Sequence, residues 1–133
     1  MEKMITLHEG EFRCRTINKN KELIVTDPSQ GHGGKGEAYS PVDLMVISLS
    51  SCILTVMAMV AKKQEIDTQG SQIEANYEMA PSRRIGKIYL NIAIAGKVPE
   101  DKKALLENTI RMCPVHNSLH TEIQLDVKVN YLN

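Results

Sequence analysis

Hydrophobic and polar residues alternate along three stretches in the second half of the chain. The alternation is clearest over residues 121–132, and it recurs over residues 73–79 and 88–94. A period of two is typical of a strand with one buried face and one solvated face. Residues 80–86, between the first two stretches, have the composition of a hairpin connection. We therefore predict three strands here, two of them joined as a hairpin.

The first part of the chain has the same pattern with a change of register. Ile5 and Leu7 face one way, whereas Phe12 and Cys14 continue in the other register, with Gly10 between them. A bulge or turn near Gly10 explains the change.

A second strand and a long loop follow. Residues 18–21 predict a hairpin turn that leads into an apolar strand over residues 22–27. Residues 27–41 hold four glycines and two prolines. We expect this segment to be a long loop of the domain rather than a linker, and such loops often carry function.

The longest apolar run of the chain predicts a helix. Ser40 suits the N-cap, Pro41 suits the first helical position, and Asp43 completes a capping box. The helix is predicted to end near Lys63. Residues 44–61 carry no charge. The length of this uncharged run is at the lower limit for a membrane-spanning helix. Several Ser and Thr residues within the run and the absence of Trp favour a helix buried in a soluble domain instead.

A second, amphipathic helix is predicted from residue 99 onward. Pro114 disfavours helical geometry at Cys113, so this helix should end near Met112. The resulting order is β-β-α-β-β-α-β, in which strands and helices do not strictly alternate. We therefore expect one antiparallel α+β domain over residues 1–133, rather than a parallel sheet.

Composition narrows the functional classes. Sixteen basic and sixteen acidic residues cancel, and the chain has one Phe, four Tyr and no Trp. We therefore expect neither nucleic acid nor a membrane as a partner. Three cysteines are too few for a secreted disulfide scaffold, and residues 1–11 lack the apolar core of a signal peptide. These features predict a cytoplasmic protein.

Cys52 lies in the middle of the long helix, and Ser48 and Thr55 share its face. One interpretation is a small buried hydrophobe whose neighbouring hydroxyls bond back to the helix backbone. The other is a nucleophilic or redox thiol in a small polar pocket. A mid-helix thiol lies too far from the helix N-terminus to gain from it, so a low pKa would need a cation from elsewhere.

Cys113 follows a predicted helix end, where it is more reachable than a core cysteine. It is a candidate resolving thiol, or half of a metal site with His116. No second tight ligand pair exists in the sequence, so no metal is expected. His116 and His120 are equally compatible with plain loop residues.

The third cysteine, Cys14, alternates with Arg13 and Arg15 and shares a face with Phe12. We interpret it as a packing residue. Arg13 and Arg15 face the other way, toward solvent or a partner subunit.

Two stretches of the chain resemble the OsmC/Ohr family of thiol peroxidases. Residues 36–64 are similar to the family's Gly-x-x-Ser/Asn-Pro-x-acid-Leu motif and the apolar, cysteine-bearing helix that follows it. Residues 110–129 are similar to its Cys-Pro-Val-x-x-x-Leu loop and last strand. The predicted strand order also fits, so the resemblance covers nearly the whole chain.

The resemblance implies an OsmC-like α+β fold, with antiparallel sheets wrapped around long central helices in an intertwined homodimer. It implies active sites at the subunit interface, with Cys52 as the peroxidatic thiolate and Cys113 as the resolving thiol. The substrate would be an organic hydroperoxide, and a dithiol such as a lipoyl group would reduce the resulting disulfide. No cofactor is implied.

Candidate pocket residues around Cys52 are Ser48, Thr55, Asp43 and His116. Family members carry a Glu, paired with an Arg, where this chain has Val42. Asp43 is one position later, about 100° around the helix. Arg13 and Arg15 are the candidates for the activating cation.

Two alternatives to the peroxidase remain open. The substitution at Val42 favours a non-catalytic OsmC-like dimer that binds a small apolar ligand in the same pocket. The segment Cys113-Pro-Val-His116 favours a thiol–disulfide protein in which Cys113 is the thiol of low pKa.

Overall fold

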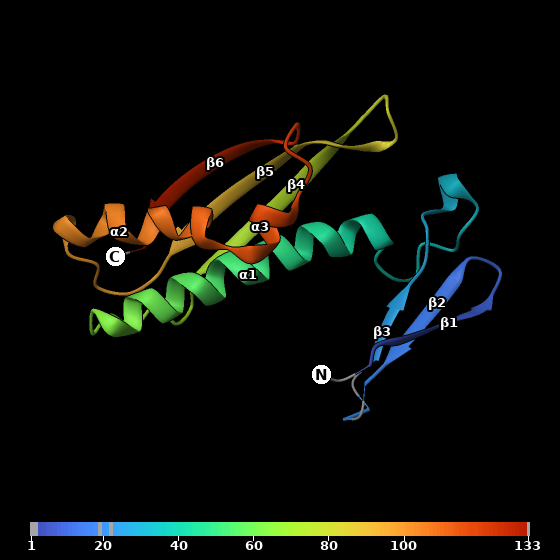
Figure 1. Ribbon diagram of the computed structural model, residues 1–133, viewed down its shortest axis with the longest axis horizontal. Coiled ribbons are helices and arrows are strands. Elements are labelled where there is room, and N and C mark those ends of the chain that lie inside the picture. Colours follow the sequence, from blue (N-terminus) through green and yellow to red (C-terminus); the bar gives the residue numbers. More distant parts are fainter. Residues whose placement is uncertain (1–2, 19, 22, 133) are drawn as a thin grey trace. The chain divides into compact units, whose positions relative to one another are not determined.

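The computed structural model describes residues 3–18, 20–21 and 23–132. The elements in chain order are β1 (Ile5–Gly10), β2 (Arg13–Ile17), β3 (Leu23–Thr26), η1 (Gln30–His32), α1 (Pro41–Lys63), β4 (Gln72–Ala80), β5 (Arg84–Ile94), η2 (Glu100–Lys102), α2 (Lys103–Glu107), η3 (Asn108–Met112), α3 (Pro114–Ser118) and β6 (Gln124–Tyr131) (Figure 1). The chain divides into two compact units, Met1–Met45 and Val46–Asn133.

The first unit contains an antiparallel sheet in the order β1-β2-β3. Its register shifts between His8 and Gly10, which confirms the irregularity predicted near Gly10. Gly10 and Glu11 both have positive φ, so the chain reverses there and starts a separate strand. The predicted element order was therefore one strand short, because β1 and β2 form a hairpin rather than one bulged strand.

The second unit contains a sheet in the order β4-β5-β6. β4 and β5 form the predicted antiparallel hairpin, with a register shift between Glu78 and Met79. The α+β class is as predicted, but β5 and β6 pair in parallel. The helical segment from η2 to α3 lies between these two strands in the chain and supplies the crossover that parallel pairing requires.

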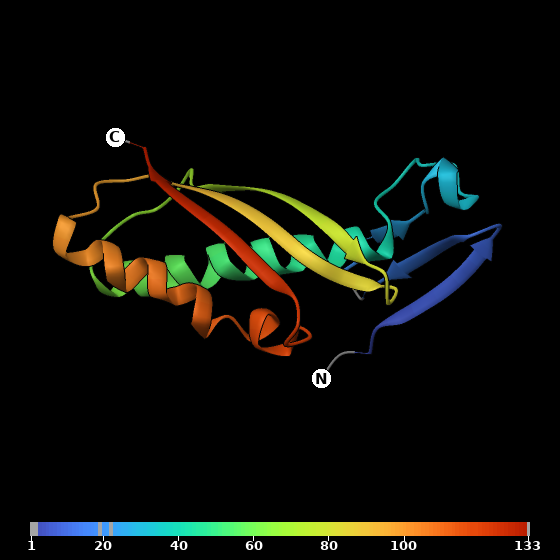
Figure 2. The ribbon, with the colours of Figure 1, turned by 90° about the horizontal axis from the view of Figure 1, so that it is seen from above.

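The hydrophobic core lies in the second unit, where the helices cover one face of the sheet (Figure 2). The buried side chains of α1 recur every three or four residues and form one stripe: Val46, Leu49, Ile53, Met57 and Ala61. β5 contributes Ile85, Ile88, Leu90, Ile92 and Ile94. By length and composition α1 could also cross a membrane, a test that core helices of soluble proteins pass as well. Only 28% of that apolar window is buried in this chain, and Met45, Ile47 and Met59 are exposed outside the buried stripe.

The start of α1 is the predicted capping box. The Ser40 backbone N–H donates to Asp43 Oδ2 at 2.9 Å, and the Asp43 N–H donates to Ser40 Oγ at 3.0 Å. Two N–H groups that the first helical turn leaves without partners are thus satisfied reciprocally. The helix ends at Lys63, as predicted.

The second predicted helix ends where expected but is less regular. Only Lys103–Glu107 is α-helical, with tighter 3₁₀ turns on both sides. The buried Thr109 hydroxyl donates to the Leu106 carbonyl and so competes with the regular helical bonding. Beyond Cys113 the sequence predicted a loop, but the chain forms the short helix α3, which begins at Pro114. Proline is favoured at that first position because it has no backbone N–H, and an N–H there would have no partner within the helix.

Candidate functional site

The second unit brings two of the three cysteines together. Cys52 lies on α1 and is half-buried, whereas Cys113 lies between η3 and α3 and is fully buried. Both are free thiols, and the Cys52 side chain lies close enough to Cys113 to help raise the pKa of Cys113. Residues 61 positions apart in the sequence therefore meet at one point of the fold.

The backbone around Cys113 fixes the position of its sulfur. Cys113 has extended geometry, with φ of −73° and ψ of 119°, as expected for a residue before proline. Its Sγ accepts a hydrogen bond from the His116 backbone N–H at 3.4 Å and so caps α3. The turn is closed by a bond from the Asn117 N–H to the Cys113 carbonyl and by one from Ser118 Oγ to the Pro114 carbonyl.

Opposing influences act on the Cys113 thiol. Burial raises the pKa of Cys113, the neighbouring Cys52 thiol raises it further, and the backbone N–H groups of His116 and Val115 lower it. The net direction is upward from the ordinary cysteine value. This direction is opposite to the low pKa that a thiol–disulfide protein centred on Cys113 needs.

The hydroxyl groups near Cys52 are largely occupied by the helix itself. Thr55 Oγ1 donates to the Ser51 carbonyl at 2.8 Å, and Ser50 Oγ donates to the Val46 carbonyl at 3.1 Å. Ser48 is exposed. For Thr55 and Ser50, the structure matches the interpretation in which hydroxyls bond back to the helix backbone.

The candidate cations Arg13 and Arg15 lie in the first unit, where each has an acidic partner. Arg13 Nη2 contacts Asp27 Oδ2 at 3.2 Å and Glu37 Oε2 at 3.0 Å. These hydrogen bonds, first with Glu37 and then with Asp27, raise the pKa of Arg13. Arg15 pairs with Glu9. Activation of Cys52 by either arginine stays a prediction.

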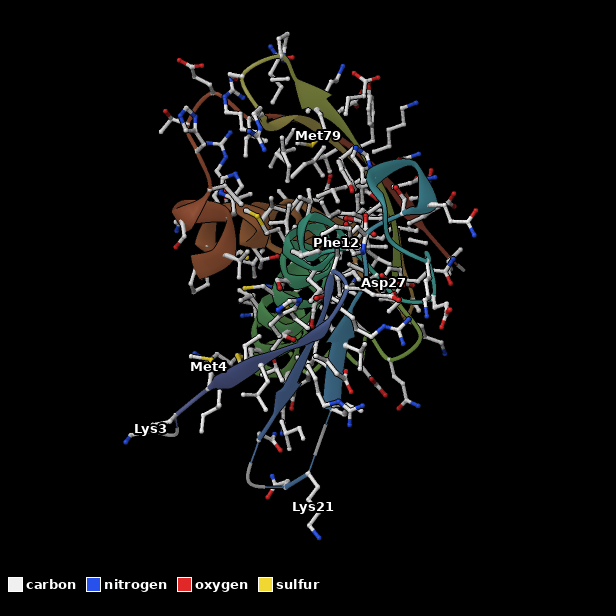
Figure 3. The ribbon with its side chains drawn as sticks, turned by 90° about the vertical axis from the view of Figure 1, so that its right-hand side faces the viewer. Lys3, Met4, Phe12, Lys21, Asp27 and Met79 are labelled. Carbon is white, nitrogen blue, oxygen red and sulfur yellow. The ribbon has the colours of Figure 1, made fainter. Side chains whose placement is uncertain are left out.

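Asp27, a buried carboxylate directly after β3, was not among the predicted site residues (Figure 3). Besides Arg13, it accepts the backbone N–H groups of Lys35 at 3.3 Å and Glu37 at 3.1 Å. The Glu37 N–H bond is the main reason that the pKa of Asp27 lies below its ordinary value. One sequence signal could have predicted this role. Asp27 stands directly before a proline and a glycine-rich loop, and Asp side chains often accept hydrogen bonds from the backbone that follows them.

The glycine-rich loop folds tightly around that carboxylate. A Cβ on Gly34 would lie 2.0 Å from the Pro28 carbonyl oxygen, so only glycine fits there. A Cβ on Gly33 would come within 3.0 Å of the Phe12 ring, which belongs to the turn between β1 and β2 (Figure 3). The predicted long loop is therefore an ordered part of the first unit.

Of two cavities in the second unit, the smaller has the candidate residue His116 in its lining and the larger has no candidate residue. One of about 280 Å³ lies beside the segment after Cys113, and its lining includes His116 and His120. The other, of about 640 Å³, lies between the last turns of α1 and the segment that follows, and Leu54, Met57 and Ile66 give it an apolar wall. Among the residues that the structure describes, no three His, Cys, Asp or Glu side chains are grouped so that they could hold a metal ion.

Comparison with known proteins gives relatives of similar fold. The family model of OsmC-like proteins matches residues 34–128, well over half of the chain. An uncharacterized protein of Methanocaldococcus jannaschii is 30% identical over 105 residues, which are 71% of this chain and 53% of that protein. The chain thus spans about half the length of this curated relative.

Solved structures cover almost the whole chain. A Psychrobacter arcticus protein, provisionally named for osmotic stress induction and a detoxification response, is 32% identical with a TM-score of 0.91, covering 98% of this chain and 96% of that one. An organic hydroperoxide resistance protein of Legionella pneumophila is 16% identical with a TM-score of 0.75, with the same coverages of 98% and 96%. The second likeness concerns the fold alone. The sequence motifs, the long cysteine-bearing helix packed on the sheet of the second unit and the matching family model together show that this chain belongs to the OsmC-like protein family.

Proposed function

We propose that this protein reduces organic hydroperoxides with Cys52 and Cys113. The observation that carries the proposal is the contact between two free thiols of unequal exposure. The Cys52 thiolate attacks the O–O bond, takes one oxygen as a sulfenic acid and releases the alcohol. The Cys113 sulfur then displaces water from that sulfenic acid and leaves a Cys52–Cys113 disulfide.

The unequal burial assigns the two roles. Cys52 is half-buried and can meet a substrate, whereas Cys113 is 0% exposed and cannot be reached from solvent. A raised pKa also keeps Cys113 mostly protonated at neutral pH, which makes it a poor first nucleophile. Both observations favour Cys52 as the attacking residue and Cys113 as the resolving one.

We also propose a second copy of the chain as a partner. In the first unit Ile5, Ile17 and Leu23 lie side by side across the three strands, at 60%, 45% and 50% exposed. Leu7 lies on the same face at 61% exposed. An apolar sheet face left open to this extent marks an interaction surface. A homodimer, as the family resemblance implies, would cover it.

The reaction needs a reducing partner and a reducing compartment. All three cysteines are free thiols in the structure, which suits the cytoplasm that we propose as its location. A dithiol is the proposed reductant, since it can open the disulfide and then close its own.

One observation favours the alternative of a non-catalytic ligand-binding protein. The cavity of about 640 Å³ with an apolar wall falls in the size range of small-molecule sites. The alternative, as the sequence predicts it, places the ligand in the pocket around Cys52, whereas none of the candidate pocket residues lines this cavity. A non-catalytic protein that held an apolar ligand here would leave the thiols unused.

Hydroperoxide consumption by the reduced protein, with intact mass before and after, separates the two functions. We expect the native protein to consume an alkyl hydroperoxide and lose the mass of two hydrogens. Cys52→Ser should be inert, and Cys113→Ser should stop at a sulfenic acid that dimedone captures. Cys14→Ser, in the first unit, is the matched control and should behave like the native chain. Unchanged peroxide with intact thiols would contradict the peroxidase and favour the ligand-binding alternative.

A further inference from the structure

The two sulfurs of the proposed disulfide differ in how a reductant can reach them. We propose that the incoming thiol attacks the sulfur of Cys52, so that Cys113 leaves as the thiolate, held by the backbone turn after it. This inference rests on the proposed function, in which that disulfide is the product of peroxide reduction. It assigns the site of the mixed disulfide that links protein and reductant.

Access is the main argument. Thiol–disulfide exchange needs a thiolate aligned with the S–S bond on the side opposite the leaving sulfur. Cys113 is 0% exposed and is preceded by the equally buried Leu106 and Thr109. Attack on Cys113 would have to come from this packed interior. Attack on Cys52, which is half-buried on α1, comes from the side that the chain leaves accessible.

The turn after Cys113 is where the released sulfur is held. The His116 backbone N–H already donates to Cys113 Sγ at 3.4 Å, and the Val115 N–H also lowers the pKa of this sulfur. Burial outweighs both N–H groups, so the pKa of Cys113 is raised overall and Cys113 is not the faster leaving group. Access to Cys52 therefore carries the assignment, and the turn holds the Cys113 sulfur in place once it is released.

The exchange then proceeds in two balanced steps. The first thiolate of the reductant forms a bond to Cys52 and breaks the Cys52–Cys113 bond, and the released Cys113 takes up a proton. The second thiol of the reductant, losing its proton, attacks the reductant's own sulfur in the mixed disulfide. The protein regains both thiols, and the reductant leaves as a cyclic disulfide.

This order of events gives a physical reason for the dithiol reductant that the family resemblance already implies. The released Cys113 stays in contact with Cys52 and can attack it again, which expels a monothiol and restores the protein disulfide. A dithiol with closely spaced sulfurs avoids this reversal, because its second sulfur competes within the same complex. The site should therefore turn over faster with a dithiol than with a monothiol of similar pKa at equal thiol concentration.

Trapping the mixed disulfide tests the assignment. The disulfide is made in two ways, with an alkyl hydroperoxide and with diamide, and is exposed briefly to glutathione as a monothiol probe. Excess N-ethylmaleimide stops the exchange, and trypsin places the two cysteines on separate peptides, residues 36–62 and 112–128. The same disulfide unfolded in guanidinium is the control, because both sulfurs are then accessible.

We expect glutathione on the Cys52 peptide and maleimide on the Cys113 peptide, in an excess of about tenfold or more that disappears in the unfolded control. Glutathione on Cys113, or an even distribution in the folded protein, overturns the inference. If diamide forms the disulfide and hydroperoxide does not, the proposed function fails. The disulfide made with diamide then still tests which sulfur glutathione attacks. If neither oxidant forms it, the two sulfurs cannot bond and the inference fails as well.

Discussion

Each of the two units of this chain is stabilised internally by a different kind of interaction. In the second unit, a stripe along α1 and one face of β5 are buried together with Leu106 and Cys113. In the first unit, the only buried side chain among the described residues is a carboxylate, Asp27. The second unit thus has a conventional hydrophobic core, whereas the first depends on ion pairs, backbone hydrogen bonds and an apolar face that its own residues leave open.

The difference explains where chemistry can be positioned accurately. A packed core holds side chains in defined conformations, so two sulfurs on separate elements can stay in contact. The loop around Asp27 achieves local order by another route, with one carboxylate accepting two backbone N–H groups and an arginine. That arrangement orders a loop but buries little apolar surface, so the unit should gain much of its stability from a partner surface.

The largest expected effect comes from truncating the core of the second unit. Leu106 is 0% exposed and its neighbour on α2, Leu105, is 39% exposed. Leu106→Ala should lower the free energy of unfolding by about 2–5 kcal/mol through lost transfer energy and a cavity. Leu105→Ala is the matched control and should cost less than about 1 kcal/mol. Urea denaturation of both variants measures the difference, and equal losses would contradict a core centred on this unit.

The second largest effect is expected when a charge is introduced on the apolar face of the first unit. Ile17→Asp places a charge between Ile5 and Leu23 on this face, whereas Thr16→Asp places the same charge on the opposite face. Burying an unpaired carboxylate in an interface is costly, so Ile17→Asp should weaken dimerisation by about tenfold or more. Sedimentation velocity over a range of concentrations checks this. A native protein that stays monomeric, or two variants that dissociate alike, would contradict the proposed role of this face.

Comparison of sequence with structure shows which of these features patterns can predict. Period-two alternation located all three strands of the second unit, and Ser40 with Asp43 located the start of α1, because local chemistry determines those elements. The contact between Cys52 and Cys113 was an expectation from family resemblance, since 61 residues separate them and no local pattern sets that distance. The parallel pairing of β5 with β6 and the role of Asp27 depend on tertiary contacts, which periodicity does not encode.

Neutralising Asp27 should have a smaller effect that depends on pH. Because its folded pKa lies below the ordinary value of 3.8, its contribution to stability is complete above that value and is lost as pH falls through the folded pKa. Asp27→Asn should lower the thermal midpoint at neutral pH and flatten its decline in acid. Glu37→Gln, which alters an exposed partner of the same Arg13, should do neither. Thermal melts between neutral and acidic pH compare the two, and parallel curves for Asp27→Asn and the native chain would contradict the role of this carboxylate.

The smallest effect is expected from replacing Pro114, whose fixed backbone geometry supports the formation of the Cys52–Cys113 disulfide. Pro114 keeps Cys113 out of the helix and in the geometry that caps α3, whereas Pro99 stands before η2 and away from the cysteines. Replacing either proline with alanine frees the unfolded chain similarly and should cost about 0.4–1 kcal/mol of stability. Only Pro114→Ala should also slow the formation of the Cys52–Cys113 disulfide, by about threefold, because the capping bond to sulfur is worth roughly 1 kcal/mol or less. Single-turnover oxidation by an alkyl hydroperoxide, followed by acid quench and mass analysis, gives this rate. If Pro114→Ala and Pro99→Ala form the disulfide equally fast, the sulfur is held by the packed core of the second unit alone, and the turn after Cys113 contributes to the stability of the fold without assisting its chemistry.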